Sequence, residues 1–377
     1  MFTFFQNYLI EITVSVFGFI ILLQLLYYTL LFFKFAFHKP KPTLPVEGLP
    51  ISVVISAKNE AHNLIKTLPI IADQKYPCFE IVVVNDNSND ETEFVIKDCA
   101  TKYSNIKLVN LNSSVTNIKG KKFPLSLGIK AATYENILFT DADCFPVSDQ
   151  WLSKMARHFT GKKQIVLGYS SFYKKSGLLN SVIRFDVLHV AIQYFSYYLA
   201  KMPFMGNGKN LAYTKDLFFK NKGFTSQYHL SYGDEELFIN KSASYSICAI
   251  EYDHDSHTIS RPKSHLNAWV RNKVNQNKAR KLFQRKHRFL LNIYNTLMPL
   301  VYLLFIPALI LTIHNYLFLS IVCGLMLLKI VFQFLAFGFA AKKLNEKRLI
   351  PFIILYDILF AIINPIIFAV TSLTKNR

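Results

Sequence analysis

The chain has 377 residues, of which 51% are hydrophobic, and it carries a formal net charge of +19. That length allows one or two domains. The five cysteines are odd in number and include no C-x-x-C pair, which argues against a disulfide or zinc framework and fits a reduced compartment.

The positive charge is concentrated towards the C-terminus. From residue 256 onward, 17 Lys and Arg face two acids, whereas the first 255 residues contain 26 Lys and Arg against 22 acids. This excess lies beside long apolar runs, and no nucleic-acid-binding motif accompanies it. Anionic membrane lipids are therefore the expected partner, and nucleic acid is not.

The first predicted element is a membrane anchor. Residues 12–33 form an apolar run that matches the ~20 residues of a spanning helix, and no Lys or Arg precedes Lys34. A cleaved signal peptide is the alternative, but the run has neither a basic start nor a small-residue cleavage site. We predict an uncleaved anchor over residues 1–36, followed by a Pro-rich linker over 37–49.

The segment from 50 to 255 alternates apolar, β-branched runs with helical patterns. Strands are predicted at 51–57, 79–84, 106–111 and 136–140, and helices at 60–73, 92–103 and around 125–132. Asn59 is placed to cap the first of these helices. This alternation is typical of an α/β domain with a parallel sheet, which binds ligands at the carboxyl ends of its strands.

Three polar turns follow predicted strands and should therefore meet at one sheet edge. They read "KNE" after 51–57, "NDNS" around Asp86, and "DAD" at Asp141 and Asp143. Asp86 can accept a hydrogen bond from a base N–H group. Two aspartates without a nearby histidine suit Mg²⁺ or Mn²⁺ on a diphosphate better than zinc. A helix cap is the alternative use of the "DAD" turn, and the residues alone leave both open.

Two later segments are candidates for a second half of the site. Residues 205–224 contain Gly206 and Gly208, which permit close backbone approach, and Asn210, a possible hydroxyl partner. The run "YGDEELFINK" at 232–241 supplies three adjacent acids. A solvated helix start is the alternative, because acids favour the first turn of a helix. The aromatic run before these segments, 179–205, carries too many polar residues for a further span.

The remainder is predicted to associate with the membrane. Residues 256–290 are basic and carry Trp269 on an amphipathic helical pattern, which is expected to lie in the membrane interface. Apolar runs within 291–373 predict three transmembrane helices, in which Lys329 and Asp357 can pair. The basic flanks place the central domain in the cytoplasm, at the plasma (inner) membrane.

Four motifs in order resemble the nucleotide-binding half of membrane-bound family 2 inverting glycosyltransferases. They are "ISVVISAKNEAHNL", "QKYPCFEIVVVNDNSNDET", "KGKKFPLSLGIKAA" and "ILFTDADC". The resemblance covers roughly residues 50–285 and implies a GT-A fold, a Rossmann-like nucleotide-diphospho-sugar transferase domain, with one N-terminal and about three C-terminal transmembrane helices.

The resemblance also implies donor-side roles. Asp86 matches the aspartate that contacts the nucleobase, with Ala57 and Glu60 flanking the same pocket. Asp141 and Asp143 match the D-x-D motif, in which Asp143 binds the metal and Asp141 lies near the ribose and sugar. The lysines at 119–122 match a family position near the nucleotide, although a solvated cluster is an equal alternative.

On the acceptor side, the family's catalytic base aligns with Asp234, and Glu235 is the runner-up. The family's Q-x-x-R-W motif is degraded to "QNKARK" here. Gln276 and Arg280 remain, and Arg280 as a ligand of the donor diphosphate is as plausible as an interfacial role.

The expected function is metal-dependent transfer of a sugar, of the hexosyltransferase type, from a nucleotide-sugar to an acceptor. The donor is expected to be a UDP-sugar, and the acceptor a lipid-linked or membrane-proximal glycan. A processive polysaccharide synthase is the alternative within the same class. A catalytically silent membrane scaffold is the alternative from another class, which the intact carboxylates disfavour.

Overall fold

The computed structural model describes residues 2–40, 48–111, 120–261 and 265–374. The chain divides into two compact units. Unit 1 comprises Met1–Lys39, Leu188–Ala200 and Gln284–Lys375, and unit 2 comprises Pro40–Val187 and Lys201–Phe283. Lys119 and most of the predicted linker lie outside the described residues.

Unit 2 is built on a seven-stranded sheet with the order β3-β2-β1-β4-β8-β6-β9. The strands are β1 (Ile51–Ala57), β2 (Phe79–Asn85), β3 (Ile106–Asn110), β4 (Asn136–Phe139), β6 (Ile165–Leu167), β8 (Leu211–Thr214) and β9 (Cys248–Ile250). The first four run parallel, as predicted. β8 runs antiparallel to both β4 and β6, so the sheet is mixed rather than wholly parallel.

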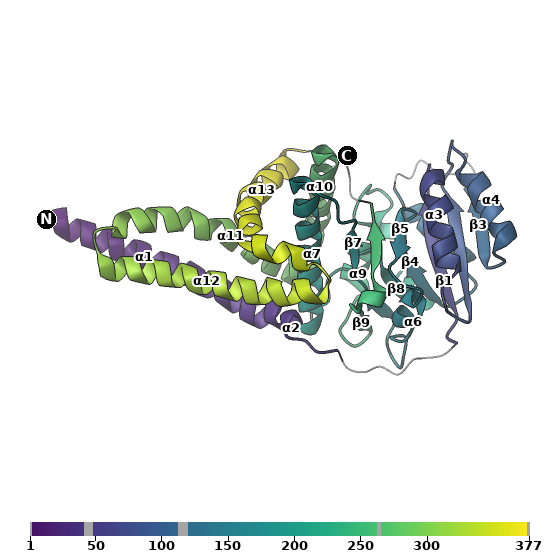
Figure 1. Cartoon of the computed structure of the whole chain (residues 1–377), viewed down its shortest axis with the longest axis horizontal. Coiled ribbons are helices and arrows are strands. Elements are labelled where there is room, and N and C mark those ends of the chain that lie inside the picture. The colour runs from purple at the N-terminus through teal and green to yellow at the C-terminus, as the bar shows by residue number, and fades with distance from the viewer. Residues whose placement is uncertain (1, 41–47, 112–119, 262–264, 375–377) are drawn as a thin grey trace. The chain divides into compact units, whose positions relative to one another are not determined.

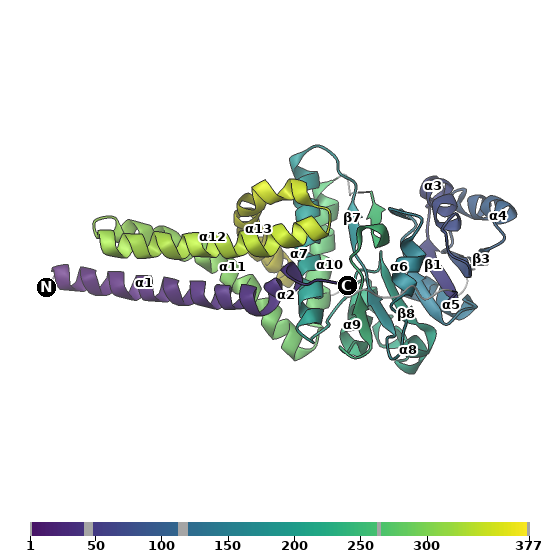
Figure 2. The same cartoon turned by 60° about the horizontal axis from the view of Figure 1, so that its bottom comes forward.

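Helices cover both faces of this sheet. α3 (Ala61–Ala72), α4 (Thr92–Lys102) and α6 (Trp151–Ala156) contribute to one apolar core with alternate residues of β1. α5 (Lys122–Ala131) packs on the opposite face, so α3 and α5 lie on opposite sides of β1 (Figure 2). All seven residues of β1 are consequently buried, which explains why this strand reads as a continuous apolar run.

The strand register brings the three polar turns together. Ala57, the last residue of β1, lies opposite Asn85, the last residue of β2. On the other side of β1, Val54 pairs with Phe139 at the end of β4. The turns that follow these strands therefore share one edge of the sheet, as the sequence predicts.

A three-stranded sheet and further helices complete unit 2. The strands are β5 (Cys144–Pro146), β10 (Thr258–Ser260) and β7 (Ser170–Phe172), and the helices are α8 (Lys215–Lys220), α9 (Asp234–Ser242), α10 (Leu266–Lys281) and the first part of α7 (Leu178–Leu199). β10 lies between β5 and β7.

Trp269 of α10 packs within unit 2, and the location of the 256–290 region in the membrane interface stays a prediction. The Trp269 side chain is 5% exposed, and its indole N–H donates to Asp186 of α7 at 3.0 Å. Lys273, one helical turn later, donates to the same carboxylate at 2.7 Å. The acid on α7 thus gives this face of α10 a partner within the protein.

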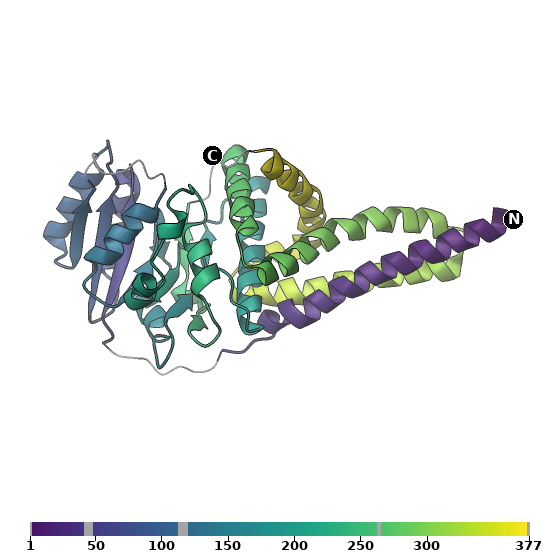
Figure 3. The same ribbon diagram turned by 180° about the vertical axis from the view of Figure 1, so that it is seen from behind.

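Unit 1 contains α1 (Phe2–Tyr27), α2 (Phe33–Ala36), α11 (Arg285–Thr312), α12 (Tyr316–Lys343), α13 (Ile353–Leu373) and the second part of α7. A π-helical turn, Tyr28–Phe32, joins α1 to α2. α1, α11 and α12 run side by side, whereas α13 lies across their direction (Figures 1 and 3).

Four helical segments of the described chain are long and apolar enough to cross a membrane, as the sequence predicts. They are Tyr8–Ala36, Arg285–Thr312, Tyr316–Lys343 and Lys347–Leu373. α7 is not among them, in agreement with the prediction from its polar residues.

The predicted pairing of Lys329 and Asp357 within the apolar helices is confirmed. Both side chains are almost completely buried, and they form an ion pair between α12 and α13. The Lys329 ammonium also donates to Tyr302 at 3.0 Å and to Gln333 at 2.7 Å. These bonds satisfy the buried charge and tie α13 to the other helices.

Candidate active site

The turns after β1 and β2 are joined by hydrogen bonds. The backbone N–H of Asp86 donates to the carbonyl of Ala57 at 2.8 Å. The Asp86 carboxylate lies 3.7 Å from the ammonium of Lys58 and is about one-quarter exposed. Asp86 is thus held at the sheet edge with a carboxylate that a ligand can reach.

The prediction that Asn59 caps the first helix is wrong. Glu60 occupies the N-cap position and makes no side-chain cap bond. The Asn59 side chain instead accepts a hydrogen bond from the backbone N–H of Asn89 at 2.8 Å. The backbone N–H of Asn59 donates to the Ser88 hydroxyl at 3.0 Å. Asn59 has a φ of 55°, which turns the chain back towards the β2 turn.

Glu60 is held by its backbone and by its side chain. Its N–H donates to the Thr92 hydroxyl at 2.8 Å, and its carboxylate accepts from the Asn63 amide at 2.6 Å. These bonds fix the wall of the site that Ala57 and Glu60 are predicted to flank.

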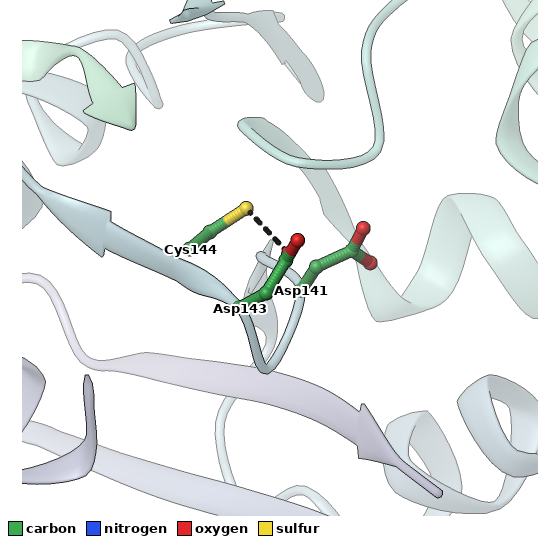
Figure 4. A group of neighbouring side chains, drawn as sticks. All are labelled: Asp141, Asp143 and Cys144. Carbon is green, nitrogen blue, oxygen red and sulfur yellow. Dashed lines mark hydrogen bonds between the residues drawn. The ribbon is translucent and has the colours of Figure 1, made fainter. Parts of the chain in front are cut away.

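The turn after β4 presents two carboxylates and a thiol (Figure 4). The ligand atoms of Asp141, Asp143 and Cys144 all lie within 4.8 Å of one another. The Cys144 thiol donates to Asp143 at 3.3 Å. Burial raises the pKa of Cys144, Lys209 opposes this effect, and the two aspartates add to it, so the thiolate form is disfavoured. The usable donors at this turn are therefore carboxylate oxygens.

Two lysines contact these carboxylates. Lys121 donates to Asp141 at 2.6 Å. Lys209, which precedes β8, lies 3.8 Å from Asp141 and 3.6 Å from Asp143, and it donates to Ser260 at 2.8 Å. Burial lowers the pKa of both lysines, but the neighbouring acidic groups outweigh it and raise each pKa overall. The sequence analysis does not identify Lys209 as a site residue. Its only sequence signal is its position directly after Gly206–Asn207–Gly208, the "GNG" segment.

The carboxylates of Asp141 and Asp143 fit a hard divalent cation. They supply oxygen donors at the end of a buried strand, and the raised pKa of the cysteine beside them disfavours its thiolate. Oxygen-only donation suits Mg²⁺ or Mn²⁺.

The three adjacent acids at the start of α9 have three different partners. Asp234 pairs with Lys122 at 2.5 Å, and the lysine side chain is completely buried. Glu236 lies under the influence of the positive charges of Arg280 and Lys273. Glu235 instead interacts with Asp141 and with Lys121. These two residues, together with Asp143 and Lys209, form what is called here the aspartate–lysine cluster.

Lys122 also donates to the carbonyls of Leu230 and Tyr232, each at 2.9 Å. One buried ammonium thus joins the start of α5 to the loop that leads into α9. Gly233, the N-cap of α9, has a φ of 68°, which favours glycine. A Cβ atom on Gly233 would lie 2.9 Å from the Cβ of Ala279 on α10, so α10 closes this turn from behind.

Glu235 lies against the backbone of the "GNG" segment. A Cβ atom placed on Gly208 would lie 2.5 Å from the carboxyl carbon of Glu235. Only glycine at 208 therefore lets the carboxyl group approach this closely. Burial, together with the charges of Asp234 and Asp141, raises the pKa of Glu235 to about 8.

Asn210 is not available as a hydroxyl partner, contrary to the sequence prediction. It is completely buried, its amide donates to the carbonyls of Tyr169 and Ser256, and its oxygen accepts from Trp151. Gly206 is also a packing position, because a Cβ atom there would meet Leu211 at 2.8 Å.

Comparison with known proteins gives one family. Residues 52–215 match Glycosyl transferase family 2. The poly-β-1,6-N-acetyl-D-glucosamine synthase of Staphylococcus epidermidis is 32% identical over 139 residues, which are 36% of this chain and 32% of the synthase. The amylovoran biosynthesis glycosyltransferase AmsB of Erwinia amylovora is 32% identical over 106 residues, 28% of this chain and 33% of AmsB. The matches span about a third of the length of each of these relatives.

Among solved structures, the mannosyltransferase PcManGT of Pyrobaculum calidifontis, in complex with GDP-Man and Mn²⁺, has a TM-score of 0.57. It is 20% identical, and the alignment covers 89% of this chain and 98% of that one. At this identity, the likeness establishes a shared GT-A fold.

Proposed function

Because residues 52–215 of this chain form a glycosyl transferase family 2 domain, we propose that the protein transfers a sugar from a nucleotide-sugar donor to a glycan acceptor at the membrane. One observation carries the proposal. The Asp86 turn, the Asp141–Asp143 turn and Glu235 belong to the same unit, and Lys121 interacts with both Asp141 and Glu235.

The donor is proposed to be a UDP-sugar, with its base at Asp86 between Ala57 and Glu60. Asp143 and Asp141 would hold Mg²⁺ or Mn²⁺, which would supply positive charge for the donor diphosphate. Lys121 and Lys209 already place positive charge beside these carboxylates. Arg280 is a weaker candidate for the diphosphate, because its charge acts on Glu236 and Lys273.

Glu235 is proposed as the general base, ahead of Asp234. Asp234 is neutralised by the buried Lys122, whereas Glu235 interacts with Asp141 and lies against Gly208. In its ionised form, which a divalent cation on Asp141 and Asp143 would favour, Glu235 would take the proton of the acceptor hydroxyl while the hydroxyl oxygen attacks the anomeric carbon. The bond from that carbon to the diphosphate oxygen breaks with its electron pair, and attack from the opposite face inverts the configuration.

The test uses the full-length protein in detergent with a panel of UDP- and GDP-sugars and either Mg²⁺ or Mn²⁺. Release of nucleoside diphosphate should require metal and select one donor. Asp143→Ala should abolish metal-dependent donor binding. Glu235→Gln should keep donor binding and lower kcat about 10²–10⁴-fold. Asp234→Asn is the matched control. A greater loss of kcat in this control than in Glu235→Gln would return Asp234 to the role of base.

Processive synthesis is a second candidate, because one relative is named as a polysaccharide synthase. In this chain no tryptophan follows Arg280, and Trp269 is committed to Asp186. These features favour single transfer. The length of the product formed from a radiolabelled donor distinguishes the two candidates.

A further inference from the structure

α13 is long and apolar enough to cross a membrane, yet it lies across the direction of α1, α11 and α12 (Figures 1 and 3). Its 21 residues measure about 31 Å, close to the ~30 Å thickness of the hydrocarbon core of a bilayer. Length alone therefore permits a span. The contacts that α13 makes with α11 show whether it continues in one direction or turns back.

The end of α12 lies on the side of the membrane from which the chain enters unit 2. The Lys343 ammonium, in the last turn of α12, donates to the carbonyls of Phe35 and His38, just before unit 2 begins. α11 starts on this side too, because it directly follows the last segment of unit 2. On this side, the near side, lies Arg285, and later residues of α11 lie farther from it.

The contacts of α13 with α11 move back towards the near side as α13 advances. Asp357, in the second turn of α13, accepts a hydrogen bond from Tyr302 of α11. Seven residues later, the Asn364 amide contacts the Met298 sulfur at 3.9 Å. Met298 precedes Tyr302 by one helical turn, so it is nearer to the start of α11. A crossing helix would instead advance by about 10 Å over those seven residues and meet α11 near Leu309.

Basic residues flank α13 at both ends. Lys347 and Arg348 precede it in the sequence, and Lys375 and Arg377 follow it. A crossing helix would place one of these pairs on the far side of the membrane, against the tendency of basic residues to remain in the cytoplasm. A helix that turns back keeps both pairs on the near side. The charges of the flanks therefore agree with the order of the contacts.

The two faces of α13 have different partners. Asp357, on the inward face, is almost completely buried and forms an ion pair with Lys329 of α12. The outward face presents large apolar side chains that are 39–84% exposed, namely Leu355, Ile358, Ile362, Ile366, Phe368 and Leu373. A surface of this kind is stabilised by contact with hydrocarbon. Lipid acyl chains fit it, because α13 belongs to the same unit as the predicted spans α1, α11 and α12.

We propose that α13 is a re-entrant helix, which enters the membrane from the near side and returns to that side, with its outward face against the acyl chains of the near leaflet. The chain then crosses the membrane three times, at α1, α11 and α12. The inference adds an interaction surface and its partner, the lipids of one leaflet, and it does not depend on the proposed sugar transfer.

Cysteine accessibility tests the return of α13 to the near side. The full-length protein carries Cys78→Ser and Cys323→Ser, and its other three cysteines are buried. Thr374→Cys, at the exposed end of α13, should react with a membrane-impermeant maleimide under the same conditions as Lys347→Cys, whichever way the protein is oriented. Reaction under the conditions that label His314→Cys, in the turn between α11 and α12, would overturn the inference. So would failure of Thr374→Cys to react in permeabilised cells while it reacts in denatured protein.

Cysteine cross-linking tests the order of the contacts. In the same background, a short bifunctional thiol reagent should join Met298→Cys to Asn364→Cys. Leu309→Cys with Asn364→Cys is the matched control, because a crossing helix would bring this pair together instead. The test pair should cross-link at least tenfold faster than the control pair. Faster cross-linking of the control pair, or none in either pair, would overturn the inference.

A bimane label on Phe368→Cys tests which partner covers the outward face. In liposomes, lipids brominated on their acyl chains should quench its fluorescence, and aqueous iodide should not. The same label on Thr374→Cys is the control, and iodide should quench it. Quenching of the Phe368→Cys label by iodide would place water on this face, and quenching by neither reagent would indicate a protein partner. Either result would overturn the assignment of the face to lipid, and neither would affect the glycosyltransferase proposal.

Discussion

Lys122 is a buried cation with several partners. It neutralises Asp234 and holds the carbonyls of Leu230 and Tyr232, so a single side chain orders the approach to α9. Its neighbour Lys121 is 47% exposed and contacts Asp141 instead. The two adjacent lysines therefore have separable roles, one in stability and one at the donor carboxylates.

Substitution of each lysine by methionine tests this division. Lys122→Met should lower the free energy of unfolding by about 2–3 kcal/mol, because it leaves Asp234 and two carbonyls without their buried donor. Lys121→Met should leave stability nearly unchanged and weaken donor binding. Urea unfolding in detergent, paired with donor titration, checks both variants. Equal stability of the two would contradict the division.

The raised pKa of Glu235 predicts a pH dependence of stability in metal-free protein. Burial and the charges of Asp234 and Asp141 raise the pKa from 4.5 to about 8. Between these values the folded protein holds a proton that the unfolded chain has released. This contribution is complete below the unfolded pKa and is lost as the pH rises through about 8. Wild-type stability should therefore fall across this interval by roughly 4 kcal/mol more than that of Glu235→Gln. Parallel curves for the two proteins would show that Glu235 ionises freely in the folded state.

At the scale of elements, the contact of α5 with the sheet brings the lysines to the site. Gly128 permits this contact, because a Cβ atom there would lie 2.6 Å from a Val54 methyl of β1 and 3.0 Å from a Val84 methyl of β2. The helix begins at Lys122, so a shift of α5 would move both lysines.

Gly128→Ala should destabilise the protein by about 1–3 kcal/mol through overpacking. Val54→Ala removes the closer methyl and should destabilise by itself through a cavity. If the clash of the new Cβ atom with the Val54 methyl causes the loss of stability in Gly128→Ala, the two effects should not add. The double variant should then be about 1 kcal/mol more stable than the sum of the two single losses predicts. Thermal and urea unfolding of all four proteins measure this coupling, and strict additivity would argue against it.

At the scale of the whole molecule, the apolar helices and the basic flanks predict the membrane topology. Unit 2 and the residues between α12 and α13 are expected in the cytoplasm, and the short turn between α11 and α12 on the opposite side. In a background with Cys78→Ser and Cys323→Ser, a membrane-impermeant maleimide should label His314→Cys in intact cells. Lys347→Cys should be labelled only after permeabilisation. The opposite pattern would invert the topology.

Much of the donor side could be predicted from the sequence because it depends on local order. The apolar runs that become β1, β2 and β4 end at polar turns, and parallel pairing then gathers these turns at one edge. The location of Asp86, Asp141 and Asp143 at this edge follows directly from the parallel pairing.

The acceptor side depended on pairings between distant residues. The Lys122–Asp234 pair joins positions 112 residues apart, and nothing in "YGDEELFINK" indicates which acid a lysine on α5 will neutralise. The burial of Asn210 depends on Trp151, Tyr169 and Ser256, which come from three other segments. Local pattern does not contain such information.

The division of α7 between the units has a consequence for biosynthesis. Its second half, Leu188–Ala200, belongs with Met1–Lys39 and Gln284–Lys375. A ribosome releases this half before the C-terminal segment has been made. Phe195 of this half stacks on Phe35, which is made earlier, whereas His189 contacts Tyr294 and Phe337, so this half acquires some of its partners only late in translation. A gene cut after codon 283 would remove the Tyr294 and Phe337 partners of His189, so we expect the remaining fragment to be less soluble than the full chain.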